Sequence, residues 1–255
     1  MQLKKINKAD FLQLVYTQTD DFIAQIEAPT VFIVQQFYPK SAILQFRQKV
    51  YEAGLQTEPS WHPLFDDCPD YHRLHDNYPK AWVKSKMHAT YYHGWYEQNH
   101  ATFDFFKQIF EVKNFLAGMD KSAHIHNIPS EGAIARVNIH HYPRGGGYQT
   151  EHIDPMTKFA KIQTIIQASQ YGADFKEGGV YGKASATSEP FMIDPHTEPG
   201  DLIVMSPGIH HGVMPVDTDS KYDWKQNEGR WMVMPIILYS DYPHAKNVKP
   251  KEVEK

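Results

Sequence analysis

The second half of the chain alternates short β-type segments with turn signals, and this pattern limits the fold more than any other feature. Glycine- and proline-rich turns, such as residues 143–147 (PRGGG), punctuate the chain from Ala133 onward. The candidate strands that they separate cover residues 133–142, 148–154, 160–169, 178–183, 190–194, 200–206, 211–216 and 230–239. Eight short strands with such punctuation predict a two-sheet jelly roll, whose open end can hold a ligand.

The N-terminal region is expected to form helices and one strand beside this β-rich core. Capping residues and apolar spacing predict helices over residues 8–26, 41–54 and 101–118. Asn7 and Ser41 are the expected N-caps of the first two, and Gly54 the expected end of the second. Residues 31–37 (VFIVQQF) are β-branched and aromatic, which predicts a strand.

Residues 56–100 contain four prolines and many aromatic side chains without a clear period. Such a segment is expected to form either a lid over a binding site or an irregular wall packed by its own aromatic rings. Five of these rings are candidates for the wall of a substrate pocket, although core packing is the commoner fate of such residues: Trp61, Trp82, Tyr91, Tyr92 and Trp95.

A chain of 255 residues is expected to form a single domain of this kind, mainly β with flanking helices. Residues 1–132 are expected to form the N-terminal α/β elaboration, residues 133–240 the jelly-roll core, and residues 241–255 a solvated tail. The chain has no apolar run long enough to span a bilayer and no signal-peptide pattern. Its net charge of −4 and lack of a basic block argue against a nucleic-acid partner. A single cysteine fits a reducing compartment, so we expect a cytoplasmic protein.

The segment ARVNIHHYPRGGGYQTEHIDP carries the first chemical signal. After its glycine-rich turn, a strand presents His152 and Asp154 at positions i and i+2, so both side chains point to one face. An imidazole and a carboxylate make up two thirds of a facial triad for non-haem Fe(II). Alone the motif is weak, because 15 histidines and 17 aspartates in 255 residues give about one H-x-D by chance.

The residues that follow strengthen the signal. The segment EPGDLIVMSPGIHHGVMPV places two histidines, His210 and His211, at the start of a later strand. Arg230 then opens the hydrophobic strand GRWMVMPIILYS. An unpaired buried charge is costly, so an arginine at this position indicates an anion nearby, and a guanidinium can hold a carboxylate through two hydrogen bonds.

This order of motifs resembles the Fe(II)/2-oxoglutarate-dependent dioxygenase superfamily, which folds as a double-stranded β-helix, a form of jelly roll. The resemblance covers roughly residues 133–240 and includes the Y-P-R-G-G-G turn and the pair Gly178-Gly179. The N-terminal region shares with the family only the presence of helices beside the barrel, and no subfamily is identified.

The resemblance implies a role for each residue. His152, Asp154 and His211 would hold Fe(II), and 2-oxoglutarate and O2 would fill the remaining positions. Arg230 would pair with the distal carboxylate of 2-oxoglutarate. Strand alternation and the H-x-V-x-P form favour His211 over His210.

Two alternatives to this site are disfavoured by the sequence. The aspartate of the H-x-D motif argues against the related halogenases, which have a small residue there. A rival motif, His196-Thr197-Glu198, lacks a suitably spaced later histidine and is interpreted as a polar loop.

The polar row Arg136, Asn138 and His140 alternates along one face of the first core strand. This row either lines the barrel or forms the solvent side of an edge strand. Asn138, Tyr142 and Gln163 are the further candidates for contacts with the co-substrate.

The predicted function is hydroxylation of an unactivated C–H bond of a small molecule, such as a free amino acid or a natural-product intermediate, with release of succinate and CO2. Three alternatives remain open: desaturation or cyclisation by the same fold, hydroxylation or demethylation of a macromolecule, and a non-catalytic jelly-roll binding module. The sequence makes no prediction about the oligomeric state.

Overall fold

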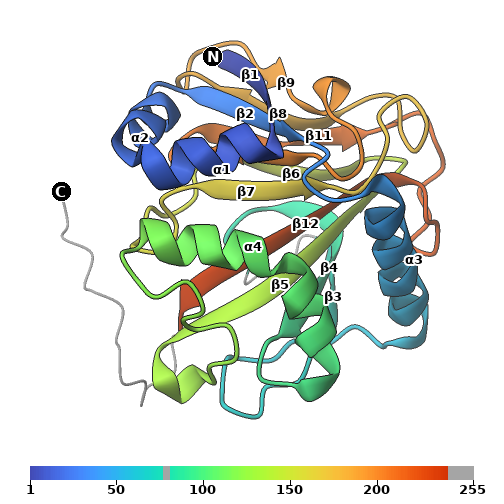
Figure 1. Cartoon of the computed structure of the whole chain (residues 1–255). Coiled ribbons are helices and arrows are strands. Elements are labelled where there is room, and N and C mark those ends of the chain that lie inside the picture. The colour runs from blue at the N-terminus through green and yellow to red at the C-terminus, as the bar shows by residue number, and fades with distance from the viewer. Residues whose placement is uncertain (77–80, 241–255) are drawn as a thin grey trace.

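The computed structural model describes residues 1–76 and 81–240. A single continuous, curled sheet runs through these residues and carries helices along one side (Figure 1). The predicted fold class, a jelly-roll core with flanking helices, is confirmed. The expected solvated tail and Pro79 of the proline-rich segment lie outside the described residues. No helix among the described residues is long and apolar enough to cross a membrane.

All eight strands predicted after residue 132 are present; β7, β9 and β10 are shorter than expected by three residues or more, and β6 and β8 by one residue each. Their bounds are β5 (Ala133–Pro143), β6 (Gly147–His152), β7 (Gln163–Gln167), β8 (Gly179–Lys183), β9 (Phe191–Met192), β10 (Leu202–Met205), β11 (His210–Val216) and β12 (Gly229–Tyr239).

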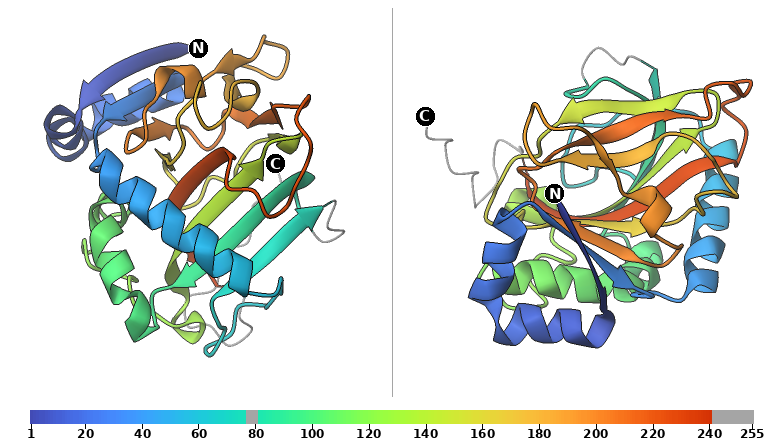
Figure 2. Two further views of the ribbon diagram at one scale, coloured as in Figure 1. Left: turned by 90° about the vertical axis from the view of Figure 1, so that its right-hand side faces the viewer. Right: turned by 90° about the horizontal axis from the view of Figure 1, so that it is seen from above.

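These strands form two antiparallel halves that curl toward each other (Figure 2). One half has the order β10-β7-β12-β5 and the other the order β6-β11-β8-β9. A strand from the N-terminal region, β4, joins them through short pairing with β6, in which Ser85 lies opposite Gln149. This arrangement leaves an interior between the two halves, and the site described below lies there.

Four strands precede Ala133, so the expectation of one is wrong. They are β1 (Gln2–Asn7), β2 (Thr30–Gln35), β3 (Tyr71–Asp76) and β4 (Ser85–His93). Strands β1 and β2 extend the sheet beyond β10, whereas β3 and β4 extend it beyond β5. The burial of β4 alternates strictly from residue to residue, which is the signature of a strand that is half covered. Because β4 contains two histidines and a lysine, its hydrophobicity pattern does not show this alternation.

The helices are α1 (Lys8–Thr17), α2 (Thr19–Glu27), α3 (Lys40–Gln56) and α4 (His100–Leu116). Asn7 caps α1 as predicted, because its side chain accepts a 2.9 Å hydrogen bond from the amide of Asp10. The first predicted helix is divided at Gln18, and Ser41 is not a cap because Pro39 occupies that position. Gly54 does not end its helix, which continues to Gln56.

The two faces of β5 meet different surroundings. Val137 and Ile139 belong to a hydrophobic core that includes helical residues such as Phe103 and Phe110. The alternate residues face the interior between the halves, because strand neighbours point to opposite sides. Strand β5 is also central, with β4 and β12 as neighbours, so the polar row on it is not the solvent side of an edge strand.

Candidate metal centre and cavity

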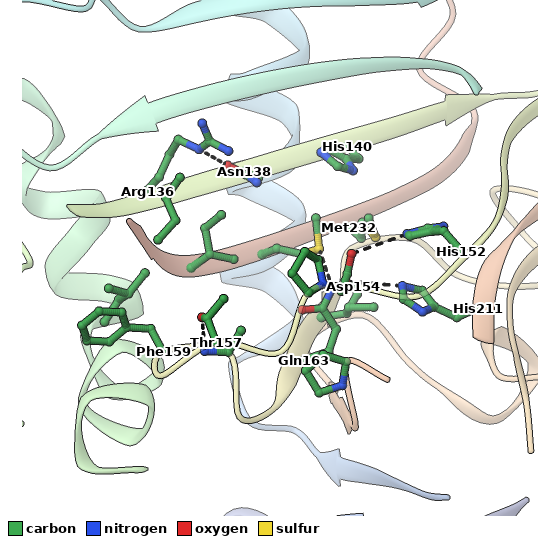
Figure 3. A pocket seen from close by; sticks show the side chains of 18 of the residues that line it. Arg136, Asn138, His140, His152, Asp154, Thr157, Phe159, Gln163, His211 and Met232 are labelled. Atoms are coloured by element: carbon green, nitrogen blue, oxygen red, sulfur yellow. Dashed lines mark hydrogen bonds and ion pairs between the residues drawn. The ribbon is translucent and has the colours of Figure 1, made fainter. Parts of the chain in front are cut away.

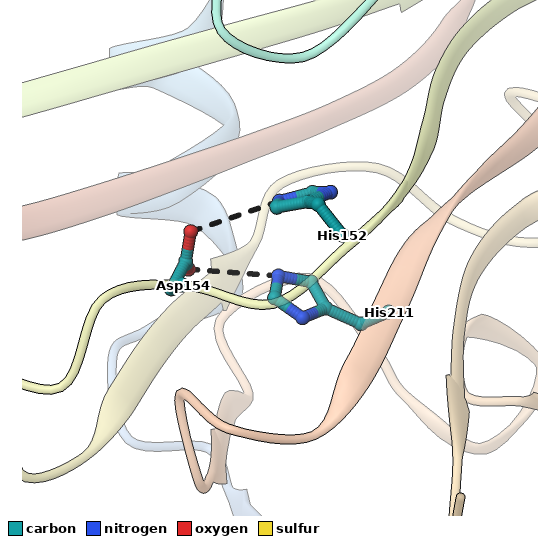
Figure 4. Close-up of side chains that lie close together, drawn as sticks. All are labelled: His152, Asp154 and His211. Atoms are coloured by element: carbon teal, nitrogen blue, oxygen red, sulfur yellow. Dashed lines mark ion pairs between the residues drawn. The ribbon is translucent and has the colours of Figure 1, made fainter. Parts of the chain in front are cut away.

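Two paired strands and the loop after one of them bring the predicted triad together (Figure 4). His152 ends β6 and lies directly opposite His211 of β11. Asp154 follows β6, and its amide donates a 2.9 Å hydrogen bond to the carbonyl of Pro207. The sheet register therefore sets the spacing of the two histidines, and the loop returns the carboxylate toward them.

The three side chains converge on one point. Asp154 Oδ1 lies 3.7 Å from His152 Nε2, and Asp154 Oδ2 lies 3.5 Å from His211 Nε2. One ligand atom from each residue lies within 4.8 Å of the others, and no other group of three such side chains in residues 1–76 and 81–240 is arranged in this way. The group could hold a metal ion.

Backbone carbonyls fix the tautomer of both histidines. His152 Nδ1 lies 2.9 Å from the carbonyl oxygen of Thr150, and His211 Nδ1 lies 2.8 Å from that of Ile209. A carbonyl can only accept, so both Nδ1 atoms donate, and the lone pair of each neutral ring is on Nε2, which faces Asp154. Burial lowers the pKa of His152, which keeps this imidazole neutral and able to bind a metal.

The Asp154 carboxylate is held in its charged form. Burial raises the pKa of Asp154, but the protonated forms of His211 and His152, together with Lys113, outweigh this effect, and the net pKa is lowered. Gln163 donates a 2.7 Å hydrogen bond from Nε2 to Asp154 Oδ2. Gln163, predicted as a co-substrate contact, thus lies against the metal-binding group and orients its carboxylate.

The alternative histidines lie elsewhere. His210 Nδ1 lies 3.1 Å from Glu151 Oε1 on the opposite side of β11, as strand alternation requires. His196 stacks on Phe191, and its neighbour Glu198 pairs with a lysine on the surface. Neither histidine belongs to the candidate metal site.

A cavity of about 440 Å³ opens beside the triad (Figure 3). Arg136, Asn138 and His140, the polar row of β5, line it, so this row faces the barrel interior. Met232 continues the wall on β12. Of the five aromatic candidates for a pocket wall, Trp82 alone lines this cavity; it is 70% exposed, and its ring lies 6.3 Å from that of His152.

Arg230 lies at the start of β12 and is fully buried. Its Nε donates a 2.7 Å hydrogen bond to Asp194 Oδ2, so one anion beside it is a carboxylate of the chain itself. The two Nη atoms are buried and have no hydrogen-bond partner among the described residues. Met232, two residues further along the same face of β12, lines the cavity.

The partner of Arg230 has no signature in the sequence. Asp194 is 36 positions away from Arg230 and lies in a short 3₁₀ helix, Asp194–His196. Its Oδ2 also accepts a 2.6 Å hydrogen bond from the amide of Val180. Only the fold brings these groups together, so no local motif could have identified the pair.

Of the other two predicted co-substrate contacts, Tyr142 lies beside Arg230, and neither of these two residues lines the cavity, whereas Asn138 does. Tyr142 lies opposite Arg230 in the sheet, and its hydroxyl donates a 2.9 Å hydrogen bond to Gln149. Burial raises the pKa of Tyr142, so the hydroxyl stays protonated. Asn138 accepts a 2.7 Å hydrogen bond from Arg136 and lines the cavity.

No family model matches this chain, and no curated protein matches its sequence. Among solved structures, it is similar to a Neurospora crassa protein in complex with alpha-KG and thymine, with a TM-score of 0.55 and 12% identity over 93% of this chain and 86% of that one. A prolyl hydroxylase from Trichoplax adhaerens, solved with a peptide fragment of hypoxia inducible factor, is similar with a TM-score of 0.52 and 14% identity, over 92% of this chain and 94% of that chain.

A prolyl-4-hydroxylase from Pseudomonas putida is also similar, with a TM-score of 0.50 and 11% identity over 86% of this chain and 96% of that chain. Identities this low concern the fold alone. The predicted fold is therefore confirmed: the chain shares the fold of these solved structures and of a putative 2OG-Fe(II) oxygenase family protein from Caulobacter crescentus, and it has a His-Asp-His group that could hold a metal.

Proposed function

We propose that this protein is an Fe(II)/2-oxoglutarate-dependent oxygenase that hydroxylates a C–H bond of a small molecule. The observation that carries the proposal is the convergence of two imidazole Nε2 atoms and one carboxylate in the interior of a jelly roll. Together these are the ligands of the facial triad used by non-haem Fe(II) oxygenases.

The donor set fits Fe(II). Both imidazoles have their second nitrogen engaged by a carbonyl, and the carboxylate is ionised and oriented by Gln163. His152, Asp154 and His211, which all line the cavity, would hold the ion there. Bound there, it supplies the activation of O2, in which one oxygen atom goes to 2-oxoglutarate as it becomes succinate and CO2 and the other converts R–H into R–OH.

The residues around Arg230 fit 2-oxoglutarate. Two buried guanidinium nitrogens without partners among the described residues are costly unless an anion satisfies them, and a carboxylate matches their geometry. Asp194 holds the Nε side of the guanidinium and so leaves the Nη side for the co-substrate. The Tyr142 hydroxyl stays protonated and could donate to the same carboxylate in place of Gln149 Oε1.

The cavity supports a small-molecule substrate. Its volume of about 440 Å³ is in the range of ligand pockets, and methionine and isoleucine side chains of β12 supply apolar walls. The similar structures were solved with ligands of different size, one with thymine and another with a peptide. Desaturation or cyclisation would use the same residues, since both also begin with removal of a hydrogen atom from the substrate.

The test is the visible absorption band that forms when a 2-oxo acid chelates Fe(II) without oxygen. We expect the band in the wild-type protein and its loss in Asp154→Ala. In Arg230→Ala we expect the 2-oxoglutarate concentration for half-saturation to rise at least 10-fold, while Fe(II) binding stays within about twofold. Absence of the band in wild-type protein that binds Fe(II) would contradict the co-substrate assignment. An unchanged 2-oxoglutarate requirement in Arg230→Ala would show that another residue anchors the distal carboxylate.

A further inference from the structure

The cavity beside the triad carries two cations for which the proposed chemistry has no use. Arg136 on β5 and Lys113 on α4 both line it, and the one carboxylate among its described lining residues is Asp154. Figure 3 shows Arg136 and Asn138 across the cavity from His152 and His211. Neither cation is part of the site around Arg230.

Arg136 is held in place without being neutralised. Its Nε donates a 2.7 Å hydrogen bond to Asn138 Oδ1, and its guanidinium lies 4.7 Å from the ring centre of Tyr91. These contacts fix the guanidinium but bring no negative charge, and no described carboxylate lies within ion-pair distance of it. An arginine held in this way by neutral groups is prepared to bind an anion.

Lys113 is the more deeply buried of the two cations. It is 3% exposed, and its Nζ donates a 3.0 Å hydrogen bond to the carbonyl of Ile162. No described carboxylate lies within ion-pair distance of this ammonium group, although Asp154 is close enough to act on it electrostatically. A buried lysine without an ion-pair partner destabilises the folded chain, so its position beside the cavity indicates a ligand that compensates the charge.

The charges of the loaded site leave one positive charge in excess. Fe(II) brings two positive charges, Lys113 and Arg136 bring one each, and Asp154 removes one. His140 adds none, because burial lowers its pKa to about 3. Arg230 is offset by Asp194, and 2-oxoglutarate brings two negative charges. A substrate with a single negative charge would balance the cavity.

We propose that the substrate is a small molecule with one carboxylate, which Arg136 and Lys113 bind while its reacting carbon lies near His152, Asp154 and His211. This inference rests on the proposed function, because it treats the triad as the oxidising centre. The methionine and isoleucine side chains of β12 that line the cavity would contact the carbon skeleton. The carboxylate thus sets the orientation, and the length of the skeleton sets which carbon is oxidised.

The test compares matched acids and amides. The panel consists of the straight-chain carboxylic acids from butanoate to decanoate and the N-acetyl-L-amino acids, each with its primary carboxamide. We expect at least one acid to raise the melting temperature of the metal-free protein and to stimulate succinate release by the Fe(II)-loaded enzyme, and its amide to do neither. A panel in which no acid binds, or in which amides act as well as acids, would overturn the proposal.

Variants assign the effect to the two cations. Arg136→Gln and Lys113→Met should each weaken binding of the effective acid at least 10-fold, and Arg136→Lys should restore part of the affinity because it keeps the charge. The control is Lys107→Met on the same helix, whose side chain is 50% exposed and lies beside Glu111, and it should bind the acid like wild type.

The outcomes separate this proposal from the oxygenase assignment. If Arg136→Gln raises the 2-oxoglutarate requirement instead of the acid requirement, Arg136 anchors the co-substrate and the substrate inference is wrong. If the Fe(II)–2-oxoglutarate band forms normally and no acid binds, the substrate inference fails while the oxygenase assignment stands. If the band never forms, the oxygenase assignment itself fails.

Discussion

At the scale of single residues, the site depends on groups whose charge or tautomer is set by the groups next to them. Backbone carbonyls turn the Nε2 atoms of His152 and His211 toward Asp154, and the Asp154 carboxylate stays ionised although it is partly buried. A change at one of these atoms should therefore alter chemistry more than stability.

Asp154→Ala should have the largest effect on activity for the smallest effect on the fold. We expect succinate formation to fall by more than 100-fold, because the metal loses the one anionic ligand of the triad, while the circular dichroism spectrum stays that of the wild type. Retained turnover in this variant would remove Asp154 from the ligand set.

The burial of Lys113 should make the stability of the folded chain depend on pH. Burial lowers its pKa to about 8 in the folded chain, against an ordinary value near 10.4 when unfolded. Between these values the unfolded chain holds a proton that the folded chain lacks, so the stability of the metal-free protein rises with pH across this window.

Lys113→Met should lack this rise. Between about pH 7.5 and 9.5, the free energy of unfolding of the wild type relative to Lys113→Met should increase by on the order of 2 kcal/mol, as measured by urea denaturation. Lys107→Met, an exposed change on the same helix, should follow the wild type at both pH values. A constant difference between wild type and Lys113→Met would mean that Lys113 is not desolvated.

At the scale of elements, a buried ion pair ties β12 to the segment between β9 and β10. Arg230 and Asp194 are both fully buried, and Asp194 also accepts a hydrogen bond from the amide of Val180 in β8. Removing one member of such a pair leaves an uncompensated charge in the interior.

Asp194→Ala should therefore destabilise the chain by about 3–5 kcal/mol in urea denaturation. The double variant Asp194→Leu/Arg230→Met, which replaces both charges with apolar groups, should recover much of this loss while failing to bind 2-oxoglutarate. A loss below about 1 kcal/mol in the single variant would mean that water reaches the pair.

Some of these elements could be predicted from the sequence, and others could not. The eight core strands were predictable because glycine and proline turns bound each of them. The grouping of His152, Asp154 and His211 was predictable because the order of the motifs resembles a known family, and strand alternation separated His211 from His210, although Asp154 itself lies in the loop after β6. Strands β3 and β4 were missed because histidine, lysine and nearby prolines mask their period. The partner of Arg230 and the cavity position of Lys113 depend on contacts between distant segments, which no local pattern records.

At the scale of the whole molecule, the proposed metal and co-substrate sites draw residues from both halves of the sheet. His152 and His211 belong to one half, whereas Arg230 belongs to the other. Ligands held across this interior stabilise the folded chain and not the unfolded one.

With Fe(II) and 2-oxoglutarate at about 100 times their dissociation constants, each saturated site contributes about 2.7 kcal/mol. For a chain of this size the melting temperature should rise by roughly 5–10 °C per site under anaerobic conditions. Asp154→Ala should show no shift with Fe(II), and a shift of the same size in that variant would place the metal elsewhere.

The most direct measurement is an anaerobic titration of the metal-free protein with Fe(II), comparing wild type, His211→Ala and His210→Ala. These two histidines are adjacent on β11 but point to opposite faces, so the pair separates ligation from a general effect of losing an imidazole. We predict one equivalent of tightly bound Fe(II) in wild type and His210→Ala, and a loss of affinity of about 100-fold or more in His211→Ala. Equal binding by all three proteins, or no stoichiometric binding by the wild type, would show that His152, Asp154 and His211 do not form a metal site.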